Sequence, residues 1–361
     1  MDTSTQKSYT KSHGQSFLGF KKKLQKYLNN YEIKKIEKAF SLASKAHMGQ
    51  YRKTGEDYIE HPLSAASILA DFEMDYETLM AAILHDVIED TDYDKNYIQK
   101  TFGEKISELV DGVSKLDKIN FSTSEEASAA NLRKMLLAMS NDIRVILIKL
   151  ADRKHNLETI DGLDIAKRKK IGRETLEIFA PIALRLGIHS LHTELEDLSF
   201  RSLYPTRYSV LREELIKTRG NRNEVMEKIR RTLLDKLSSE GVKQDITARE
   251  KHIYGIYKKM KQKEIKFADI HDIFGVRVLC ECVDDCYRSL GIIHNLYTPI
   301  PGRFKDYIAI PKSNGYQSLH TSIFGPHGLP IEIQIRTNEM NVLAQSGIAS
   351  HWLYKSKITP S

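Results

Sequence analysis

The sequence predicts two domains of different class, an all-α domain followed by an α+β domain. The chain has 361 residues, which is too long for one ordinary hydrophobic core. Apolar residues recur with a helical spacing up to about residue 200 and with the alternation of strands after about residue 245. With 41% hydrophobic and 29% charged residues, the composition indicates a globular rather than a disordered chain.

Charge and cysteine content narrow the function only slightly. The net charge of +7 fits a protein that binds phosphates, nucleotides or nucleic acid. No apolar run reaches the length of a membrane span, and the polar residues 1–24 are predicted to form a flexible leader rather than a signal peptide. Cys280, Cys282 and Cys286 form one cluster, so neither a disulfide framework nor a zinc site is predicted, which favours a reducing cytoplasm.

The first domain is predicted to be helical throughout. Its helical segments are expected at residues 31–47, 63–72, 76–90, 95–117, 126–139, 142–160 and 165–186. In the following stretch, Val225, Ile229, Leu233 and Leu237 recur every four residues among charged residues. This pattern predicts an amphipathic helix that packs on one side only, as a connector between domains would.

Strands are predicted in the second domain. Residues 272–280 and 330–337 alternate between apolar and polar side chains and are rich in β-branched residues. Helices are expected at residues 252–263, 284–296 and 338–354, and turns rich in glycine and proline separate the elements. This order of elements predicts an α+β domain.

Residues 85–90, HDVIED, place one histidine and three carboxylates at the end of an apolar segment. On a helical wheel His85, Asp86, Glu89 and Asp90 form one patch opposite the apolar arc. Carboxylates at the C-terminal end of a helix are unfavourable, because the helix dipole is negative there. The patch is therefore either a solvated helix end or a site for a cation.

Other segments offer further ligands for a cation. Asp152 and Asn156 follow a second apolar helix at a spacing of four, and His61 stands just before Pro62 at the start of a third helix. Two histidines and two aspartates suit manganese or iron, and zinc or magnesium less well. Such a metal would lower the pKa of a bound water, and Glu89 and Asp90 could orient that water or move its proton. From spacing alone, a metal site and a solvated surface remain equally open.

The motifs AHMGQYRKTGEDYIEHP, ILHDVIEDT and IKLADRKHN make this region recognisable. Residues 25–195 resemble the HD-type hydrolase domain of the RelA/SpoT homologue family, the enzymes of (p)ppGpp metabolism. The resemblance implies Mn²⁺ ligands at His61, His85, Asp86 and Asp152, and a catalytic acidic pair at Glu89 and Asp90. It implies nucleotide contacts at Arg52, Lys53, Thr54, Asn156 and Thr159. The family often has Pro in place of Asp57 and Leu in place of Lys154, and neither difference removes a ligand.

The strand PIEIQIRT sends Glu332, Gln334 and Arg336 to one face and three isoleucines to the other. That polar face could simply be exposed to solvent. Alternatively, Glu332 and Asp272, which begins another strand, could share Mg²⁺ and activate a hydroxyl group. Residues 303–320 lie between them and carry several cations and Tyr316, which is typical of a loop that binds phosphates and a base.

Residues 246–361 resemble the (p)ppGpp synthetase domain of the same family, through AREKHIYGIYKKM, DIFGVRV, RFKDYIAIPKSNGYQSLHT, EIQIRT and ASHWLYK. The resemblance implies a nucleotidyltransferase-like fold with a mixed sheet, catalytic roles for Asp272 and Glu332, and Mg²⁺. Tyr316 would stack on guanine, and the implied nucleotide-binding residues are Arg249, Lys251, Lys259, Arg277, Lys312, Asn314, Tyr316, Gln317 and His320.

Several features bear on which activity dominates. RFKD at 303–306 matches the basic form of a motif that is acidic in synthetase-only members, which points to a bifunctional or hydrolase-dominant protein. Gly255, Gly275 and Gln345 replace the usual Ser, Ala and Glu, and are expected to remove packing, a hydroxyl group or a charge beside the synthetase site. Residues 196–245 would form the connector between the domains.

The resemblance implies a cytoplasmic enzyme of the stringent response. It would hydrolyse the 3′-pyrophosphate of (p)ppGpp and transfer pyrophosphate from ATP to GDP or GTP. The expected partners are guanine nucleotides, (p)ppGpp, ATP and a regulatory C-terminal half, and neither a membrane nor nucleic acid nor the ribosome is implied. The alternatives are a hydrolase with a degenerate, regulatory synthetase domain, and a catalytically silent module that binds nucleotides or nucleic acid.

Overall fold

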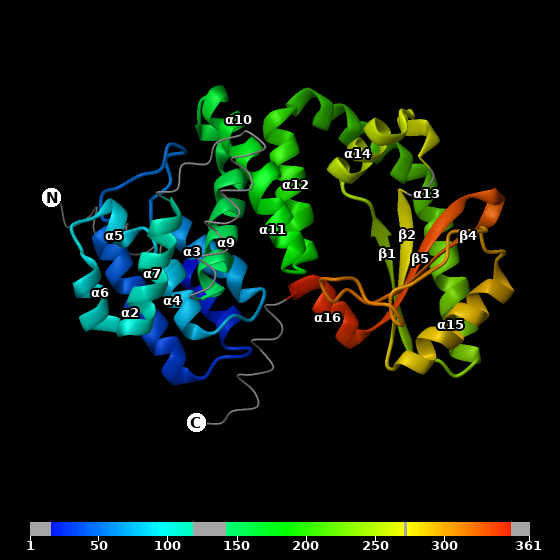
Figure 1. The fold of residues 1–361 in the computed structure, drawn as a ribbon, viewed down its shortest axis with the longest axis horizontal. Helices are drawn as coiled ribbons and strands as arrows, with labels where there is room; N and C mark the ends of the chain where they lie inside the picture. The colour runs from blue at the N-terminus through cyan, green and yellow to red at the C-terminus, as the bar shows by residue number, and fades with distance from the viewer. Residues whose placement is uncertain (1–15, 118–141, 271–272, 348–361) are drawn as a thin grey trace. The chain divides into compact units, whose positions relative to one another are not determined.

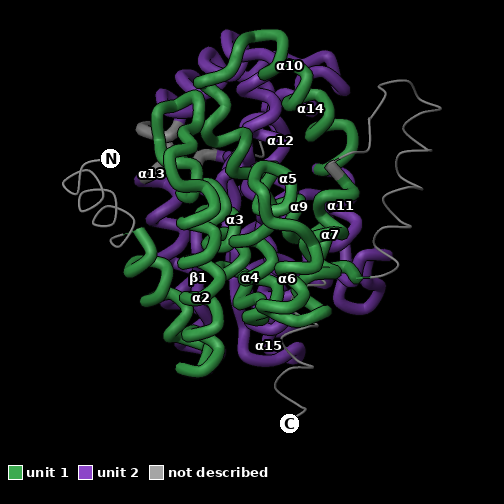
Figure 2. Tube along the Cα trace, turned by 90° about the vertical axis from the view of Figure 1, so that its left-hand side faces the viewer, with its two compact units in different colours: residues 1–179, 351–361 green, residues 180–350 purple. Residues whose placement is uncertain are grey.

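The computed structural model describes residues 16–117, 142–270 and 273–347. The described chain divides into two compact units, one within residues 1–179 and one within residues 180–350 (Figure 2). Helices build the first unit, and helices with a five-stranded sheet build the second, which confirms the predicted fold class. None of the described helices combines the length and apolarity needed to cross a membrane.

The helices of the first unit follow the predicted order. They are α2 (Asn30–Ala46), α3 (Glu60–Ala70), α4 (Tyr76–Leu84), α5 (Val87–Asp90), α6 (Lys95–Phe102), α7 (Glu104–Asp117), α9 (Arg144–Glu158) and α10 (Ile165–Glu174). The segment predicted as one helix at 95–117 is two helices, because Gly103 adopts a φ of 97° and ends α6. The helix predicted at 126–139 lies outside the described residues.

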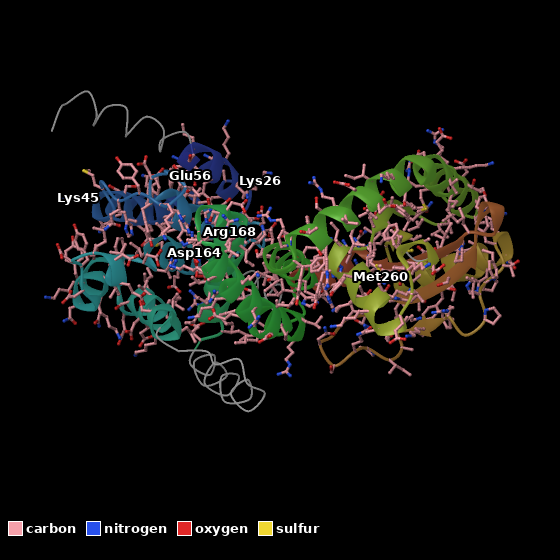
Figure 3. The ribbon with its side chains drawn as sticks, turned by 90° about the horizontal axis from the view of Figure 1, so that it is seen from above. Lys26, Lys45, Glu56, Asp164, Arg168 and Met260 are labelled. Carbon is pink, nitrogen blue, oxygen red and sulfur yellow. The ribbon has the colours of Figure 1, made fainter. Side chains whose placement is uncertain are left out.

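Local capping interactions explain where several of these helices begin. Asn29 and Glu32 form a capping box at the start of α2, in which each side chain binds the backbone of the other residue. At α10 the Asp164 carboxylate accepts the backbone N–H of Lys167 at 2.9 Å, and nearby Arg168 donates from Nε to the Leu163 carbonyl at 2.7 Å (Figure 3).

Helices α3, α4 and α9 form the centre of the first unit. Helix α3 packs on both α4 and α9, and α4 also contacts α2 and α7. Helix α4 is buried continuously from Thr78 to Leu84, and α9 from Arg144 to Asp152. Because both helices are buried along these stretches, the polar side chains of His85 and Asp152 near their C-terminal ends are buried as well.

The prediction of one continuous helix over residues 76–90 is wrong. Helix α4 ends at Leu84, and the short helix α5 begins only at Val87. At the junction the His85 side chain donates from Nδ1 to the Ala82 carbonyl at 2.8 Å, a local bond that competes with the backbone ladder. His85 and Asp86 therefore lie between two helices, and the two acidic residues that follow belong to α5.

The second unit contains a mixed sheet. Its helices are α11 (Ala180–Arg185), α12 (His189–Leu203), α13 (Pro205–Ser239), α14 (Ile253–Lys263), α15 (Val283–Leu296) and α16 (Asn338–Ser346). Its strands are β1 (Gln244–Glu250), β2 (Phe274–Cys280), β3 (Lys305–Asp306), β4 (Leu319–Phe324) and β5 (Pro330–Thr337), in the order β1-β2-β5-β4-β3. Strands β2 and β5 are parallel, and the other pairs are antiparallel.

Strands β2 and β5 were expected from their alternation, whereas β1 and β4 were not. Strand β1 lies at an edge of the sheet, and Ile246 is its one fully buried residue, so its sequence carries little apolar pattern. Strand β4 does alternate, with Leu319, Thr321 and Ile323 buried.

Helices α13 and α15 pack on the apolar face of the sheet (Figure 1). The buried face of α13 includes Ile229, Leu233 and Leu237, which share a core with β2 and β5. The one-sided packing predicted for this helix is confirmed. The same apolar face helps to form the core of the second unit, and the role of residues 196–245 as a connector stays a prediction. The compact units divide at Phe179, whereas the first domain was predicted to end at residue 195.

The register of the sheet explains why a residue without a side chain is suited to position 275. Arg249 on β1 pairs with Gly275 on β2, which in turn pairs with Glu332 on β5. Paired residues share a face of the sheet, and Gly275 has no side chain between its two neighbours. Arg249 therefore reaches across β2, and its NH1 lies 3.5 Å from Oε2 of Glu332.

We predict that Gly275→Ala, which introduces the usual family residue, destabilises the second unit. A Cβ at this position would lie 2.8 Å from the Glu332 carbonyl oxygen, closer than real Cβ contacts. The expected loss is about 1–3 kcal/mol in urea unfolding, as for other overpacked interiors. Gly291→Ala is the matched control, because nothing lies within 4 Å of its Cβ on helix α15, and it should add about 0.5–1 kcal/mol. Equal effects of the two substitutions would contradict the proposed crowding.

Candidate metal centre and anion-binding cavity

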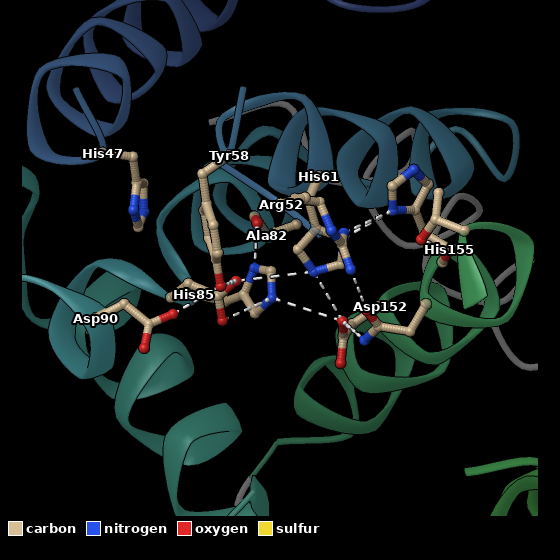
Figure 4. Close-up of polar contacts among 12 residues, drawn as sticks. His47, Arg52, Tyr58, His61, Ala82, His85, Asp90, Asp152 and His155 are labelled. Atoms are coloured by element: carbon tan, nitrogen blue, oxygen red, sulfur yellow. Dashed lines mark hydrogen bonds and ion pairs between the residues drawn. The ribbon is translucent and has the colours of Figure 1, made fainter. Parts of the chain in front are cut away.

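The first candidate site joins three parts of the first unit. His61 lies in the first turn of α3, His85 and Asp86 lie between α4 and α5, and Asp152 lies on α9 (Figure 4). Oδ1 of Asp152 is 3.0 Å from Nε2 of His61 and 3.9 Å from Nε2 of His85. Oδ1 of Asp86 is 3.1 Å from the same His85 nitrogen. The four residues predicted as ligands therefore converge on one small volume.

The donors of His61, His85 and Asp86 fit a divalent cation. Each residue can offer one ligand atom, with all three atoms within 4.8 Å of one another. His85 Nε2 is buried and has no hydrogen-bond partner within the described residues, although carboxylate oxygens lie close to it. Nitrogen and carboxylate donors in this combination bind first-row divalent metals. The predicted divalent-metal centre is therefore consistent with the donor set.

The charges of the site depend on burial and on close pairing. Burial opposes protonation of His85, but the Asp86 and Asp152 carboxylates outweigh it and raise the pKa of the imidazole. For His61, burial dominates and lowers the pKa. Burial also opposes ionisation of Asp152, but Lys149, 2.5 Å from Oδ2, and the histidines hold the pKa of Asp152 well below its ordinary range. The site thus retains an anionic carboxylate that faces the imidazoles.

The predicted acidic pair lies beside this centre. The Tyr58 hydroxyl donates to Oδ2 of Asp90 at 2.6 Å and is 3.0 Å from Oδ2 of Asp86. The ring of Tyr58 stacks on His47, with ring centroids 4.7 Å apart. Asp90 is thereby tied to a candidate ligand, while the side chain of Glu89 is exposed on α5. Tyr58 was not singled out from the sequence, since its spacing to the acidic residues carries no helical or strand signal.

The predicted nucleotide contacts gather near the end of α9. A tight turn at residues 51–57 brings Arg52 to this helix, where its NH2 donates to Oδ1 of Asn156 at 2.7 Å. Lys53 and Thr54 pack against Gly162, within 3.3 Å of where its Cβ would lie. The Thr159 hydroxyl donates to the His155 carbonyl at 2.9 Å. Asp57, at a position where the family often has Pro, pairs with Tyr51 in the turn.

The second candidate site is a cavity of about 500 Å³ over the polar face of the sheet. Gln334 and Arg336 are buried on this face, so the interpretation of the face as simply exposed to solvent is wrong for these two residues. The cations that line the cavity are Arg249, Lys251, Arg277, Lys312 and Arg336. Glu332, Tyr316 and His320 also line it, so most of the predicted synthetase residues meet here. A cavity so rich in cations favours an anionic ligand.

Two arginines of the cavity are held in an unfavourable environment. Nε of Arg277 and Nε of Arg336 are buried without a hydrogen-bond partner in the described parts of the chain. Burial and the neighbouring Arg277 lower the pKa of Arg336 to about 10. Burial and Arg249 likewise lower the pKa of Arg277. An anion in the cavity would relieve both the repulsion and the missing hydrogen bonds.

Glu332 remains ionised among these cations. Burial opposes its ionisation, but a hydrogen bond with His320 and the charge of Arg249 lower the pKa of the carboxyl group. His320 also contacts the Tyr316 hydroxyl, 2.8 Å from its Nε2. The ammonium group of Lys312 lies 5.1 Å from the centre of the Tyr316 ring.

Some predicted residues lie elsewhere or cannot be placed. The Asn314 amide donates to the Leu184 carbonyl at 3.2 Å, and the Gln317 amide donates to the Ile308 carbonyl at 3.2 Å. Neither Asn314, Gln317 nor Lys259 is among the residues that line the cavity. Asp272, predicted as the second catalytic carboxylate, lies outside the described residues.

The cavity also contains residues that the sequence analysis missed. Alternation along the strand placed Arg336 on the same face as Glu332, but no role was predicted for Arg336, which lines the cavity. His189, Ser190 and Thr193 reach the cavity from α12, and no local pattern connects that helix to the sheet. His189 lies beside Tyr316, with ring centroids 5.2 Å apart.

The expected loss of packing at Gly255 is not found. A Cβ at Gly255 would lie 2.8 Å from Cε1 of His252, so the imidazole fills this space. His252 in turn contacts the buried carboxylate of Glu196, 2.9 Å from its Nε2. Gln345 does line the cavity, and its carbonyl accepts a hydrogen bond from the Ser190 hydroxyl at 2.9 Å. Of the three departures, Gly255 and Gly275 are thus accommodated by their neighbours.

Comparison with known proteins gives the class first. Residues 39–189 match the model of the HD domain, and residues 248–359 match a model described as a region found in RelA and SpoT proteins. The HD domain implies a divalent metal, and the candidate centre described above lies within its matched residues. The chain thus belongs to the class of proteins that join an HD domain to this region.

Individual relatives identify the family. The bifunctional (p)ppGpp synthase/hydrolase SpoT of Escherichia coli (strain K12) is 54% identical over 332 residues, which are 92% of this chain and 47% of that protein. A GTP pyrophosphokinase of Myxococcus xanthus is 47% identical over 323 residues, 89% of this chain and 43% of that protein. This chain belongs to the RelA/SpoT homologue family, as its motifs indicated, and it spans about half the length of these curated relatives.

Among solved structures, the chain is similar to a metazoan orthologue of SpoT that hydrolyses ppGpp. The two chains are 25% identical, and the match covers 48% of this chain and 96% of that chain with a TM-score of 0.35.

The environment of His189 predicts a pH dependence of stability. Burial and the nearby His192, Lys312, Arg336 and Arg249 lower the pKa of His189 from 6.5 to about 4. Between these values the unfolded chain binds the proton and the folded chain does not, so stability is full above pH 6.5 and falls as the pH drops toward 4. In urea unfolding, His189→Gln should reduce the loss between pH 7 and pH 5 by roughly 1–2 kcal/mol. An unchanged pH dependence would contradict the assigned environment.

Proposed function

We propose that the first unit hydrolyses the 3′-pyrophosphate of (p)ppGpp to GDP or GTP and pyrophosphate. The single observation that carries this proposal is the convergence of His61, His85, Asp86 and Asp152 around a buried His85 Nε2 that has no hydrogen-bond partner within the described chain. A divalent ion held by these donors would supply a Lewis acid for the attack of water on a phosphorus atom. We propose Mn²⁺, since two imidazoles and two carboxylates form a mixed donor set that suits it.

The other residues of the site receive roles from their positions. Asp90, held by Tyr58 beside Asp86, and Glu89 would orient the attacking water and accept its proton. Arg52 and Asn156 form a polar contact next to the centre and would bind the nucleotide, with Lys53, Thr54 and Thr159 around them. An arginine in this position can pair with phosphate or stack on a purine.

We propose that the second unit transfers pyrophosphate from ATP to the 3′-hydroxyl of GDP or GTP. The cationic cavity supports this proposal, because it offers buried arginines to polyphosphates and the Glu332 carboxylate to a magnesium ion or a hydroxyl proton, with Glu250 as a further carboxylate in its lining. Tyr316 would stack on the guanine ring. Asp272 is proposed as the second carboxylate from its motif alone, and Lys259, Asn314 and Gln317 as further nucleotide contacts from theirs. A protein with these substrates would act in the cytoplasm.

Two alternatives remain to be tested by the same assays. A hydrolase with a degenerate synthetase domain is favoured by the basic RFKD motif and by Gln345, which replaces a charged residue beside the cavity. A catalytically silent nucleotide-binding or nucleic-acid-binding module has the net charge of +7 as its only independent support. This alternative does not explain why the four candidate metal ligands converge.

We predict that purified protein releases pyrophosphate from ppGpp in the presence of Mn²⁺. His85→Ala removes one proposed ligand and should lower the rate by at least about 100-fold, a loss of roughly 3 kcal/mol of transition-state stabilisation. Glu332→Ala, a substitution in the other unit, should leave the rate nearly unchanged. Synthesis of ppGpp from ATP and GDP by the His85→Ala protein would reject the hydrolase-only alternative, whereas hydrolysis that survives His85→Ala would reject the metal centre.

We further predict that Arg336→Met weakens nucleotide binding and raises the free energy of unfolding of the nucleotide-free protein. Removal of one buried cation relieves the repulsion that lowers the pKa of Arg336 to about 10. The nucleotide-free protein should therefore gain roughly 1–3 kcal/mol in urea unfolding, reduced by the loss of the 2.7 Å hydrogen bond to Asn341. Binding of a non-hydrolysable ATP analogue, measured by calorimetry, should weaken at least tenfold, or about 1.4 kcal/mol. Unchanged ATP-analogue affinity would show that Arg336 does not face the phosphates.

A further inference from the structure

The two histidines of the metal centre differ in the hydrogen-bond partner of Nδ1, the ring nitrogen that does not face the carboxylates. His85 donates from Nδ1 to the Ala82 carbonyl at 2.8 Å, and a carbonyl can only accept. A neutral His85 therefore always presents the lone pair of Nε2 to the centre. His61 has no such fixed partner. Its Nδ1 lies 2.7 Å from Nδ1 of His155, a second imidazole that can either donate or accept (Figure 4).

The position of Arg52 indicates which of the two Nδ1 atoms accepts the hydrogen bond between His61 and His155. NH1 of Arg52 lies 3.4 Å from Nδ1 of His155, and a guanidinium group has donors but no acceptor. Nδ1 of His155 therefore carries a lone pair, and the single proton between the two imidazoles belongs to His61. With its proton on Nδ1, a neutral His61 also presents the lone pair of Nε2 to the centre.

The consequence is an electrostatic conflict that only a cation resolves. The Nε2 lone pair of His61 faces Oδ1 of Asp152 at 3.0 Å, and that oxygen also accepts from the Asn156 amide at 2.6 Å. Two acceptors at this distance repel each other unless a proton or a metal ion lies between them. Metal-binding histidines commonly have their outer N–H fixed by an acceptor in this way.

We propose that His155 is a positioning residue for the metal centre. It accepts the Nδ1 proton of His61 and thereby directs the Nε2 lone pair of His61 toward the metal. Arg52, the proposed nucleotide contact, and the ligand His61 both point a donor at this same nitrogen, at 3.4 Å and 2.7 Å. The inference rests on the proposed metal-dependent hydrolase site and adds a residue that the motif analysis did not include.

Metal affinity of the metal-free protein tests this role directly. Mn²⁺ binding to EDTA-treated protein would be followed by the electron paramagnetic resonance signal of free Mn²⁺. His155→Leu removes the acceptor and should weaken binding about 10–100-fold. His155→Asn places a carbonyl oxygen where Nδ1 was and should restore most of the affinity. Lys154→Leu, on the same helix but directed to Glu158 at 3.1 Å, is the matched control and should bind as the wild type does.

Activity gives a second readout that a merely structural role would not produce. Hydrolysis of ppGpp by His155→Leu should recover toward the wild-type rate as Mn²⁺ is raised, because the acceptor acts through metal binding. Thermal unfolding in EDTA would verify that each variant is folded. If wild-type protein binds no Mn²⁺, the proposed function itself fails; if it binds Mn²⁺ and His155→Leu binds equally well, the role of His155 is overturned.

A measurement on unsubstituted protein keeps the inference testable if His155→Leu does not fold. In protein with ¹⁵N-labelled histidine and bound Zn²⁺, the nitrogen spectrum should place the proton of His61 on Nδ1. A proton on Nε2 of His61 would overturn the proposal.

Discussion

The first unit depends on one constraint, which is that a buried set of imidazole and carboxylate groups is stable only around a cation. His61, His85 and Asp152 are almost completely buried, and their polar atoms face each other at 3.0–3.9 Å. Burial of unpaired polar groups and charges is costly, so these side chains would not be enclosed by apolar helices without a compensating positive charge. Protons on the histidines or a divalent metal can supply that charge.

This constraint explains local features of the fold. Helix α4 ends at Leu84, where His85 turns its outer nitrogen to a backbone carbonyl instead of continuing the helix. Lys149 forms an ion pair with Oδ2 of Asp152, and Oδ1 of the same carboxylate faces the histidines. In the second unit the problem is reversed. Arginines surround a cavity with too few anions, and the absence of a side chain at Gly275 allows Arg249 to reach Glu332. One unit is thus arranged for a cation and the other for an anion.

Much of this could be predicted from the sequence, because helical spacing and motif order are local properties. The helices around His61, His85 and Asp152 and the strand that carries Glu332 were predicted close to their observed positions. The break between α4 and α5 was not, because it arises from a side-chain hydrogen bond that a helical wheel does not represent. The contributions of Tyr58, His155 and His189 were also missed. His155 lies on α9 with Asp152, one helical turn away, so its position in that helix could have suggested it. Tyr58 and His189 meet partners on other elements through tertiary packing, for which a single sequence carries no periodic signal.

We propose that the first unit contains a metal centre in which both histidines bind through Nε2. Anomalous diffraction from crystals soaked in Mn²⁺ tests it most directly, since it locates the ion and its ligand atoms together. We expect one Mn²⁺ peak in this unit, bound by Nε2 of His61, Nε2 of His85 and the Asp86 and Asp152 carboxylates. A peak that is bound elsewhere in the unit, or that contacts Nδ1 of either histidine, would contradict this proposal.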